Sequence, residues 1–206
     1  KNKNKIKKLS PERIHNEFFK ILNSANPYFV INIMKKIGIL DILFEKKTET
    51  KFFKKLLSIE KKNSMTMDQI LRFVSIAPNT KKSHLSDLKM FNFSKKDKKK
   101  LLLLTNQEFK IHNKLEKNAI ERILYSIDKQ SLVDLIILSW ALSTNKITDA
   151  DWISILSQIS KIKVPIFPLK AIDLLNFGLE EGPIIGEIIR EIEKDWISIL
   201  SQISKI

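Results

Sequence analysis

The sequence predicts an all-α protein, and three observations lead to this class. Only four Gly occur in 206 residues, and the apolar–polar alternation of half-buried strands is nearly absent. Apolar side chains recur instead at the three- and four-residue spacing of amphipathic helices. Residues that begin and end helices interrupt these series. With 43% hydrophobic residues the chain can bury a core, so we expect short and medium helices in one domain or two small ones.

Capping side chains mark the helices of the first half. Ser10-Pro11 offers an N-cap and a proline at the first helical position. Gly38 should end the next helix, because glycine readily takes the left-handed conformation that follows a helix. Pro78 should stop the third apolar series. The later helix starts of this half are expected at Asn26-Pro27, at Thr66 or Asp68, and at Ser94.

Longer apolar series predict the helices of the second half. Two of them fill residues 116–142, and two further helices are expected over residues 169–177 and 184–196, after a short extended link. The turn between the last two, GLEEGP, places two glycines before a helix start, where backbone N–H groups could bind a phosphate. Its two glutamates oppose an anion, which favours ordinary packing of a helical turn.

The segment DWISILSQISKI occurs twice, at Asp151–Ile162 and Asp195–Ile206. Structural repeats keep the buried pattern and let the surface vary, whereas these copies are identical even at Ser and Gln. The identity therefore indicates a recent copying event rather than a binding array. Each copy carries one apolar stripe. We expect Leu156 of the first copy to lie in the core, and the second copy to be an appendage from Ser198 onwards.

The positive charge is concentrated in one half of the chain, as expected for a protein that binds a polyanion. The net charge is +14. Residues 1–100 contain 25 Lys or Arg and 9 acids, a charge of +16, whereas residues 101–206 contain 12 and 14. However, 33 of the 37 cations are Lys. Codon bias would scatter lysines over any solvated surface, so both explanations stay open.

Several classes of site and location are disfavoured. Without cysteine the chain has no disulfides or thiol chemistry, which suits a cytoplasmic location. No apolar run approaches the roughly 18 residues of a membrane span, and no secretory leader is recognisable, so no membrane partner is expected. His15, His84 and His112 are dispersed, without other ligands at suitable spacing, so no metal site is predicted.

Asp149 and Asp151 have the spacing with which nucleotidyltransferases hold two magnesium ions. Such carboxylates leave a strand edge beside a Gly-rich phosphate loop, whereas these two precede an amphipathic helix. Acids in the first turn of a helix are favoured by its dipole, which explains them better. We therefore predict no catalytic residue in this chain.

The opening stretch LSPERIHNEFFKIL resembles the helix motif that closes the neck of class II tRNA nucleotidyltransferases, the CCA-adding enzymes, and of bacterial poly(A) polymerases. The family pattern is roughly Ser-x-Glu-Arg-Ile-x-x-Glu, which is matched by Ser10, Glu12, Arg13, Ile14 and Glu17. NPYFVINIMKKIGILDILF is similar to the next family helix. VPIFPLKAIDLLNFGLEEGPIIGEIIREIEKDWI is similar to the tail of the alphaproteobacterial-type branch.

The resemblance implies a helical array of four parts: the end of the neck and start of the body (residues 1–64), the body (65–163), the tail (164–197) and the duplicated appendage (198–206). No stretch resembles the family's α/β head, which carries the Gly-rich loop, the metal-binding acids and the nucleotide-selecting motif. The chain also begins with Lys1 rather than Met, so we expect a piece of a longer protein. Mg²⁺, CTP and ATP would belong to the head, and the chain alone is expected to be inactive.

The implied function is RNA binding, because the neck, body and tail of the family hold the acceptor arm and elbow of tRNA. Ser10, Glu12, Arg13 and Glu17 are expected to brace the nucleotide pocket by capping and ion pairing, with Glu17 paired to Arg13. The lysines expected to contact tRNA or other RNA are Lys35, Lys36, Lys54, Lys55, Lys81, Lys82, Lys95, Lys96, Lys98 and Lys99.

Three alternatives stay open. The head could be separately encoded, or the chain could be a non-functional remnant of a split gene. CCA addition and poly(A) addition fit the sequence equally. A free-standing helical module that binds protein partners is the rival from another class, although such a module would not require a charge of +16 in one half.

Overall fold

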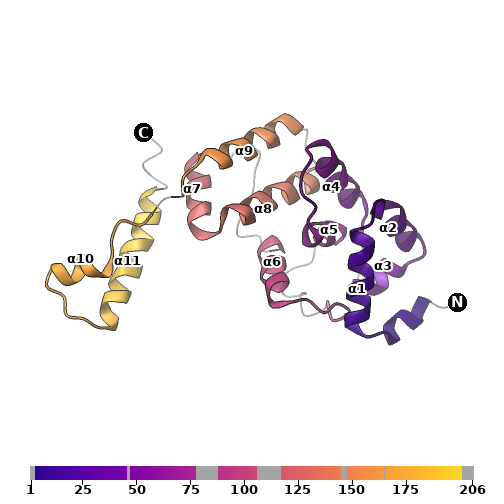
Figure 1. Ribbon diagram of the computed structural model, residues 1–206, viewed down its shortest axis with the longest axis horizontal. Coiled ribbons are helices and arrows are strands. Elements are labelled where there is room, and N and C mark those ends of the chain that lie inside the picture. The colour runs from indigo at the N-terminus through magenta and orange to yellow at the C-terminus, as the bar shows by residue number, and fades with distance from the viewer. Residues whose placement is uncertain are drawn as a thin grey trace. The chain divides into compact units, whose positions relative to one another are not determined.

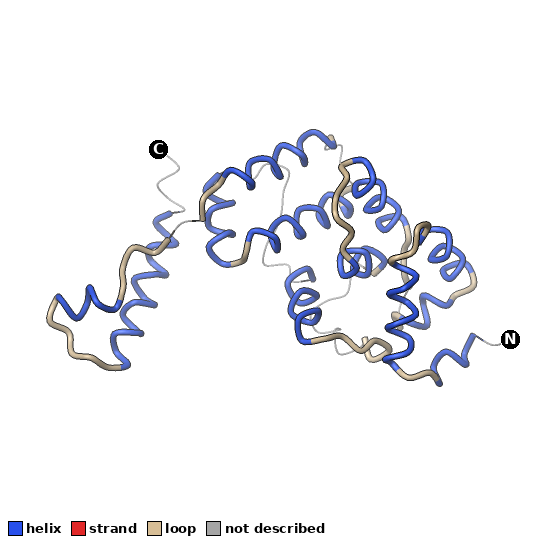
Figure 2. Tube along the Cα trace, viewed as in Figure 1, coloured by secondary structure: helices blue, strands red, loops and turns tan. Residues whose placement is uncertain are grey.

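The computed structural model describes residues 3–45, 47–77, 88–105, 117–144, 148–164 and 166–200. Across these ranges the chain forms one 3-10 helix, η1, and eleven α-helices, with no strand (Figures 1 and 2). The all-α class predicted from helical periodicity is therefore confirmed. None of the helices in the described ranges combines the length and the apolarity that crossing a bilayer requires.

The chain divides into two compact units. Unit 1 comprises Lys1–His112 and Val133–Thr148, and unit 2 comprises Asn113–Leu132 and Asp149–Ile206. The division therefore falls within helix α8 (Lys129–Leu142). The four parts expected from the family resemblance are defined by similarity of sequence and not by contacts in the structure, and they remain predictions.

Unit 1 contains the first helices of the chain and the later residues of α8. Its other helices are η1 (Lys3–Lys8), α1 (Pro11–Leu22), α2 (Pro27–Lys36), α3 (Ile39–Leu43), α4 (Lys51–Lys62), α5 (Gln69–Ile76) and α6 (Lys95–Thr105). Helix α5 contacts α1, α4 and α6, and α2 contacts α1, α3 and α4. Helix α5 thus packs against α6 on one side and against the first helices of the chain on the other.

The helix ends of unit 1 follow the predicted capping signals. Ser10 caps α1, because its Oγ accepts a hydrogen bond of 3.3 Å from the backbone N–H of Arg13. Asp68, rather than Thr66, caps α5, with two first-turn N–H groups donating to its carboxylate at 2.9 Å. Gly38 follows α2 with φ of 76°, in the left-handed region that favours glycine. These ends were predictable because capping is a local interaction.

An aromatic cluster forms the core of unit 1. Its rings come from α1, the end of α3, α5 and the loop before α6, and they are Phe18, Phe19, Phe44, Phe73, Phe91 and Phe93. Phe73 lies centrally, with ring centroids 4.9 Å from those of both Phe44 and Phe91. Edge-to-face and tilted pairs of this kind add to the burial of the rings. The loop before α6 is thereby fixed against α1 and α5.

A buried ion pair joins three helices of unit 1. Arg72 of α5 donates to Glu60 of α4, with Nη2 2.7 Å from Oε2 and Nε 3.0 Å from the same oxygen. The Nη1 atom of Arg72 donates to the backbone carbonyl of Leu22 at the end of α1. The two charged side chains are only 10% and 8% exposed. One guanidinium therefore satisfies a buried carboxylate and an otherwise unpaired helix-end carbonyl.

Lys100 makes a second polar connection in unit 1. Its Nζ lies 2.6 Å from Oδ2 of Asp68 and also pairs with Asp134 of α8, which is 3% exposed. Burial lowers the pKa of Lys100, but the bonds from the two carboxylates outweigh burial, so the pKa is raised. The ammonium thus remains charged while it links the α5 cap, α6 and α8.

Unit 2 contains the later helices of the chain and the first residues of α8. It contains α7 (Lys117–Ser126), α9 (Asp149–Lys161), α10 (Ala171–Asn176) and α11 (Pro183–Leu200). Trp196 of α11 packs against Tyr125 of α7 and Phe167, with ring centroids 5.3 Å and 5.4 Å away. The Tyr125 hydroxyl also donates to Glu193, and burial followed by this bond raises the pKa of Tyr125 to about 12. Helices α10 and α11 form the hairpin expected from the sequence (Figure 1).

The two copies of the repeat lie in different environments. In the first copy, Trp152, Ile155 and Ile159 of α9 are buried, whereas Ile153 is 45% exposed. Leu156 is only partly buried, so its predicted core position is wrong: the inward stripe of α9 runs through Ile155 instead. In the second copy, the equivalent of Ile155 is Ile199, which is 49% exposed. Residues 201–206 of that copy lie outside the described residues.

Removing Arg72 should destabilise unit 1 strongly. We expect Arg72→Ala to lower the free energy of unfolding by about 3–5 kcal/mol, because Glu60 would remain as an uncompensated buried charge. Urea unfolding followed by circular dichroism measures this loss. The double variant Arg72→Met, Glu60→Leu is the control and should recover much of the stability. A double variant no more stable than Arg72→Ala would contradict this account of the pair.

Equivalent substitutions in the two copies should have unequal effects. We expect Ile155→Ala to cost about 2–5 kcal/mol, the usual range for a buried aliphatic residue. Ile199→Ala should cost less than about 0.5 kcal/mol, because half-exposed side chains contribute little. Thermal and urea unfolding of the two variants measure both values. Equal losses would show that the copies have equivalent structural roles.

Candidate nucleic-acid interface

The residues of the expected neck motif all lie on α1. Ser10 caps this helix, and Glu12, Arg13 and Glu17 are exposed along it. The expected pairing of Glu17 with Arg13 is wrong: the Glu17 carboxylate accepts a hydrogen bond of 3.0 Å from Lys20 Nζ, three residues later. Arg13 lies four residues before Glu17 and Lys20 lies three residues after it, and both spacings allow an ion pair on a helix. The sequence therefore could not show which of the two residues pairs with Glu17. The structure thus shows the cap at Ser10, and the bracing of a nucleotide pocket by these residues stays a prediction.

Lys35 and Lys36 lie in the last turn of α2, where cations complement the helix dipole. Lys36 is exposed, but Lys35 donates to Asp41 at 2.9 Å. The same carboxylate accepts hydrogen bonds from the backbone N–H and the hydroxyl of Thr48, at 2.9 and 2.7 Å. Burial raises the pKa of Asp41, but the bonds from Lys35 and Thr48 outweigh burial and lower it. Lys35 therefore has a structural partner, whereas Lys36 projects to the surface.

The candidate lysines of α4 also divide between structure and surface. Lys54 is exposed, and its Nζ lies 5.5 Å from the ring centroid of Tyr28. Lys55 donates to the carbonyl of Ser143 at 2.8 Å and to its hydroxyl at 2.9 Å, just beyond the end of α8. Its replacement would disturb this helix end as well as any ligand. Lys81 and Lys82 lie outside the described residues.

Helix α6 presents the most concentrated positive surface among the candidates. Leu101 and Leu104 are buried on one side. Lys95, Lys96, Lys98 and Lys99 are all exposed; helical geometry directs Lys95, Lys96 and Lys99 away from the two leucines and places Lys98 beside Leu101, one turn before it. Figure 1 shows the start of α6 continuing directly from the loop that reaches α1.

This basic surface conflicts with local helix electrostatics. Lys95 and Lys96 lie in the first turn of α6, where the helix dipole disfavours cations. Ser94 offsets part of the cost: its Oγ accepts a bond of 3.1 Å from the Asp97 N–H and donates to the Asp97 carboxylate at 2.6 Å. Violations of a local rule are expected at functional sites. The two lysines thus lie at an electrostatically unfavourable helix end, which Asp97 and Ser94 partly compensate.

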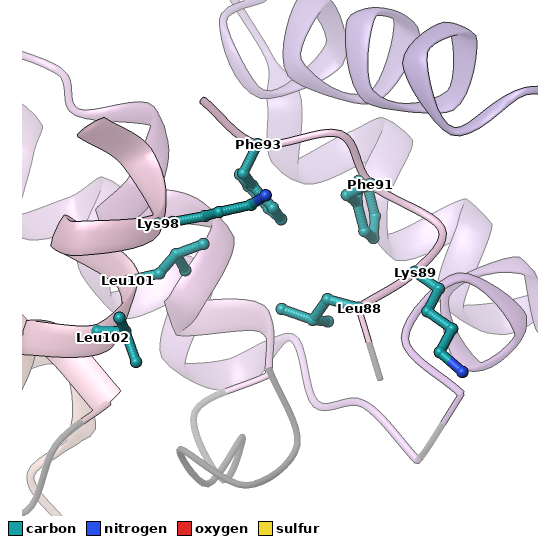
Figure 3. Close-up of a pocket in the computed structure, with 7 residues that line it drawn as sticks. All are labelled: Leu88, Lys89, Phe91, Phe93, Lys98, Leu101 and Leu102. Atoms are coloured by element: carbon teal, nitrogen blue, oxygen red, sulfur yellow. The ribbon is translucent and has the colours of Figure 1, made fainter. Parts of the chain in front are cut away.

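A pocket of about 350 Å³ adjoins this basic surface (Figure 3). One side is the loop before α6 and the other is α6 itself, from which Lys98 extends towards Phe93. The lining residues are Leu88, Lys89, Phe91, Phe93, Lys98, Leu101 and Leu102. Of these, only Lys98 was predicted to bind RNA. The close alternation of aromatic and basic residues in LKMFNFSKK was the available signal.

His15 connects the neck motif to the loop that lines this pocket. Its ring stacks on Phe19 with centroids 4.1 Å apart and meets the edge of Phe93 at 5.2 Å. Burial lowers the pKa of His15, and the nearby Asp97 carboxylate only partly opposes that change. The imidazole is thus held neutral inside an aromatic contact. His84 and His112 lie outside the described residues.

The acidic pair before the repeat and the GLEEGP turn were the other candidate sites, and the structure gives neither of them the features of a binding site. Asp149 and Asp151 lie in the first turn of α9, as predicted. Over the ranges that the structure describes, no three His, Asp or Glu side chains gather where they could hold a metal ion. In the GLEEGP turn, Gly178 has φ of 92°, and Glu180 and Glu181 are exposed. This turn therefore carries negative charge at the place where a phosphate would bind.

Comparison with known protein families identifies the start of the chain. Residues 1–50 match the family described as "Probable RNA and SrmB-binding site of polymerase A". The matched segment contains η1, α1, α2 and α3. It supports a polymerase-A-like RNA-binding region, which confirms the coarser part of the resemblance. No curated protein matches the chain.

The lowered pKa of His15 predicts a specific pH dependence. The pKa of an unfolded histidine is about 6.5, so the stability that the neutral ring contributes is complete above that pH and is lost as the pH falls towards the lower pKa of the folded state. Between about pH 7.5 and 5, the native chain should lose more stability than a His15→Phe variant, which keeps the ring contacts. Urea unfolding across this pH series measures the difference.

The other two histidines are common to both proteins, so their effects cancel in this comparison. An equal loss of stability in the variant would show that His15 does not titrate as its surroundings indicate.

Proposed function

We propose that this chain is the RNA-binding part of a poly(A) polymerase-like or CCA-adding nucleotidyltransferase. The observation that carries the proposal is the basic surface of α6, whose loop packs on the α1 segment matched by a polymerase A RNA-binding family. The charge of +16 in residues 1–100 gives independent support. The proposed ligand is tRNA, with other structured RNA as the broader class.

Binding would be directed mainly by the shape of the RNA. The exposed cations of α6 are lysines, which contact phosphates rather than base edges. The major groove of double-stranded RNA is too deep and narrow for side chains to read, so such a surface recognises the backbone and the form of the helix. Affinity should therefore vary little among tRNAs of different sequence.

Nucleotide transfer is proposed to depend on residues outside this chain. The resemblance places the metal-binding acids and the Gly-rich loop in a head domain, and Asp149 and Asp151 lie instead in the first turn of a helix. The chain would hold RNA while a head, fused or separately encoded, adds nucleotides. The class II and alphaproteobacterial-type assignments belong to the same proposal and rest on the residue patterns alone.

A second candidate function is the docking of a protein partner on α2. Three residues at four-residue spacing expose apolar side chains along this helix: Phe29 is 62%, Ile33 42% and Ile37 52% exposed. They lie within the segment whose family description also names SrmB. An apolar helix stripe is a common protein-binding surface. Binding there would be insensitive to the lysines of α6, which separates it from the RNA proposal.

Charge reversal on α6 should weaken RNA binding. We expect Lys95→Glu, Lys96→Glu, Lys98→Glu and Lys99→Glu together to reduce tRNA affinity by more than about tenfold at low salt. The slope of log affinity against log salt should fall by roughly 3–4, because each lost phosphate contact removes almost one released counterion. Filter binding over a salt series measures both quantities.

A matched control reverses four exposed lysines of the acidic half: Lys161, Lys163, Lys170 and Lys194. It makes the same change in net charge and should have a much smaller effect. A larger loss in the control than in the α6 variant would move the RNA to unit 2 and contradict the proposal.

A further inference from the structure

The pocket beside α6 combines an apolar floor with a basic rim. Leu88, Phe91, Phe93 and Leu101 are all less than 9% exposed, and they form the floor. Lys98 brings positive charge to the mouth of the pocket from α6, whereas the side chain of Lys89 runs from the loop away from the cavity (Figure 3). The volume of about 350 Å³ lies within the range of small-molecule sites. Its occupant should therefore be a small apolar group that carries, or is attached to, negative charge.

Leu102 links the pocket to the phosphate-binding surface. It is 39% exposed and lines the pocket. Its position three residues after Lys99 and four after Lys98 places it on the same side of α6 as these lysines. An apolar part of a ligand held by these lysines would therefore lie within reach of Leu102 and the pocket behind it.

We propose that this pocket receives one unpaired base of a bound RNA while the α6 lysines hold the adjacent phosphates. The inference rests on the proposed RNA-binding function and specifies its ligand as RNA with a single-stranded end or loop. A nucleobase has apolar faces and stays attached to phosphates within reach of neighbouring side chains, so it meets both requirements of the site. Proteins commonly bind single strands by pairing a cationic groove with apolar or aromatic contacts to bases.

The geometry distinguishes an unpaired base from a paired one. A base within a duplex exposes only its edge in a groove, and its faces are covered by stacking. The apolar floor would then remain unused. An end or loop of the RNA lets one base leave the stack and contact Phe91 or Leu102, while Lys98 and Lys99 remain near its phosphates.

The test compares two hairpin RNAs with equal numbers of phosphates. One is blunt, and the other has a shorter duplex with a single-stranded 3′ tail that contains 2-aminopurine. The full chain should bind the tailed RNA about five- to tenfold more tightly, the lower end of the range for one stacked base. The fluorescence of 2-aminopurine should change on binding, because its base environment changes.

Leu102→Trp, which fills the pocket mouth, is the diagnostic variant. It should abolish the preference for the tail and the fluorescence change, with blunt-hairpin affinity retained. Met67→Trp is the matched control, because Met67 is 40% exposed in the loop before α5, and it should behave as the native chain does. Circular dichroism verifies that both variants fold.

The outcomes separate the two proposals. Equal, salt-dependent affinity of the native chain for both hairpins would overturn the base pocket while RNA binding stands. A tail preference that Leu102→Trp leaves intact would also overturn it, and the pocket would then suit a protein side chain better. Failure of both hairpins and of tRNA to bind would overturn the RNA-binding function itself. The fluorescence readout on the native chain keeps the test decisive even if Leu102→Trp does not fold.

Discussion

The contact between Arg72 and Glu60 is the constraint on which the rest of unit 1 depends. A guanidinium that is 10% exposed is tolerable only when its donors are paired, and here they fix α4, α5 and the end of α1 together. Phe73, one residue further along α5, then directs its ring into the aromatic cluster. That cluster holds the loop before α6, and the loop sets where the basic surface begins. A continuous series of contacts thus runs from this interior ion pair, through the aromatic cluster, to the loop that precedes the basic surface.

Lysine has two roles in this unit, and neighbours decide between them. Lys35, Lys55 and Lys100 each lie within reach of a carboxylate or a helix-end carbonyl and act as cross-links. The cations on the outer side of α6 project to solvent and give the unit its external field. Net charge alone therefore overstates the surface available to a polyanion. The positions of the acids and helix ends are needed to identify the lysines that a ligand can reach.

Local features of the fold could be predicted from the sequence, and contacts between distant segments could not. The cap at Ser10, the end of α2 at Gly38 and the helical class depend on a few adjacent residues. Which side of α9 faces inward depends on the helices that pack against it. Helical periodicity alone therefore could not show that Ile155 is buried rather than Leu156. The links from Lys100 to Asp68 and Asp134 span more than thirty residues. The pocket likewise requires a loop and a helix to face each other, and its lining was missed apart from Lys98.

The buried position of Ile155 and the exposed position of Ile199 show that one amino-acid sequence satisfies two environments. The two copies have identical side chains, so either of them could fill the site in which Trp152 is buried. Chain connectivity is what separates them: α9 follows α8 after a short connection, and shorter loops close at a lower entropic cost. Because the side chains of the two copies are identical, the residues around each copy and its place in the chain, rather than its own chemistry, distinguish the buried segment from the exposed one.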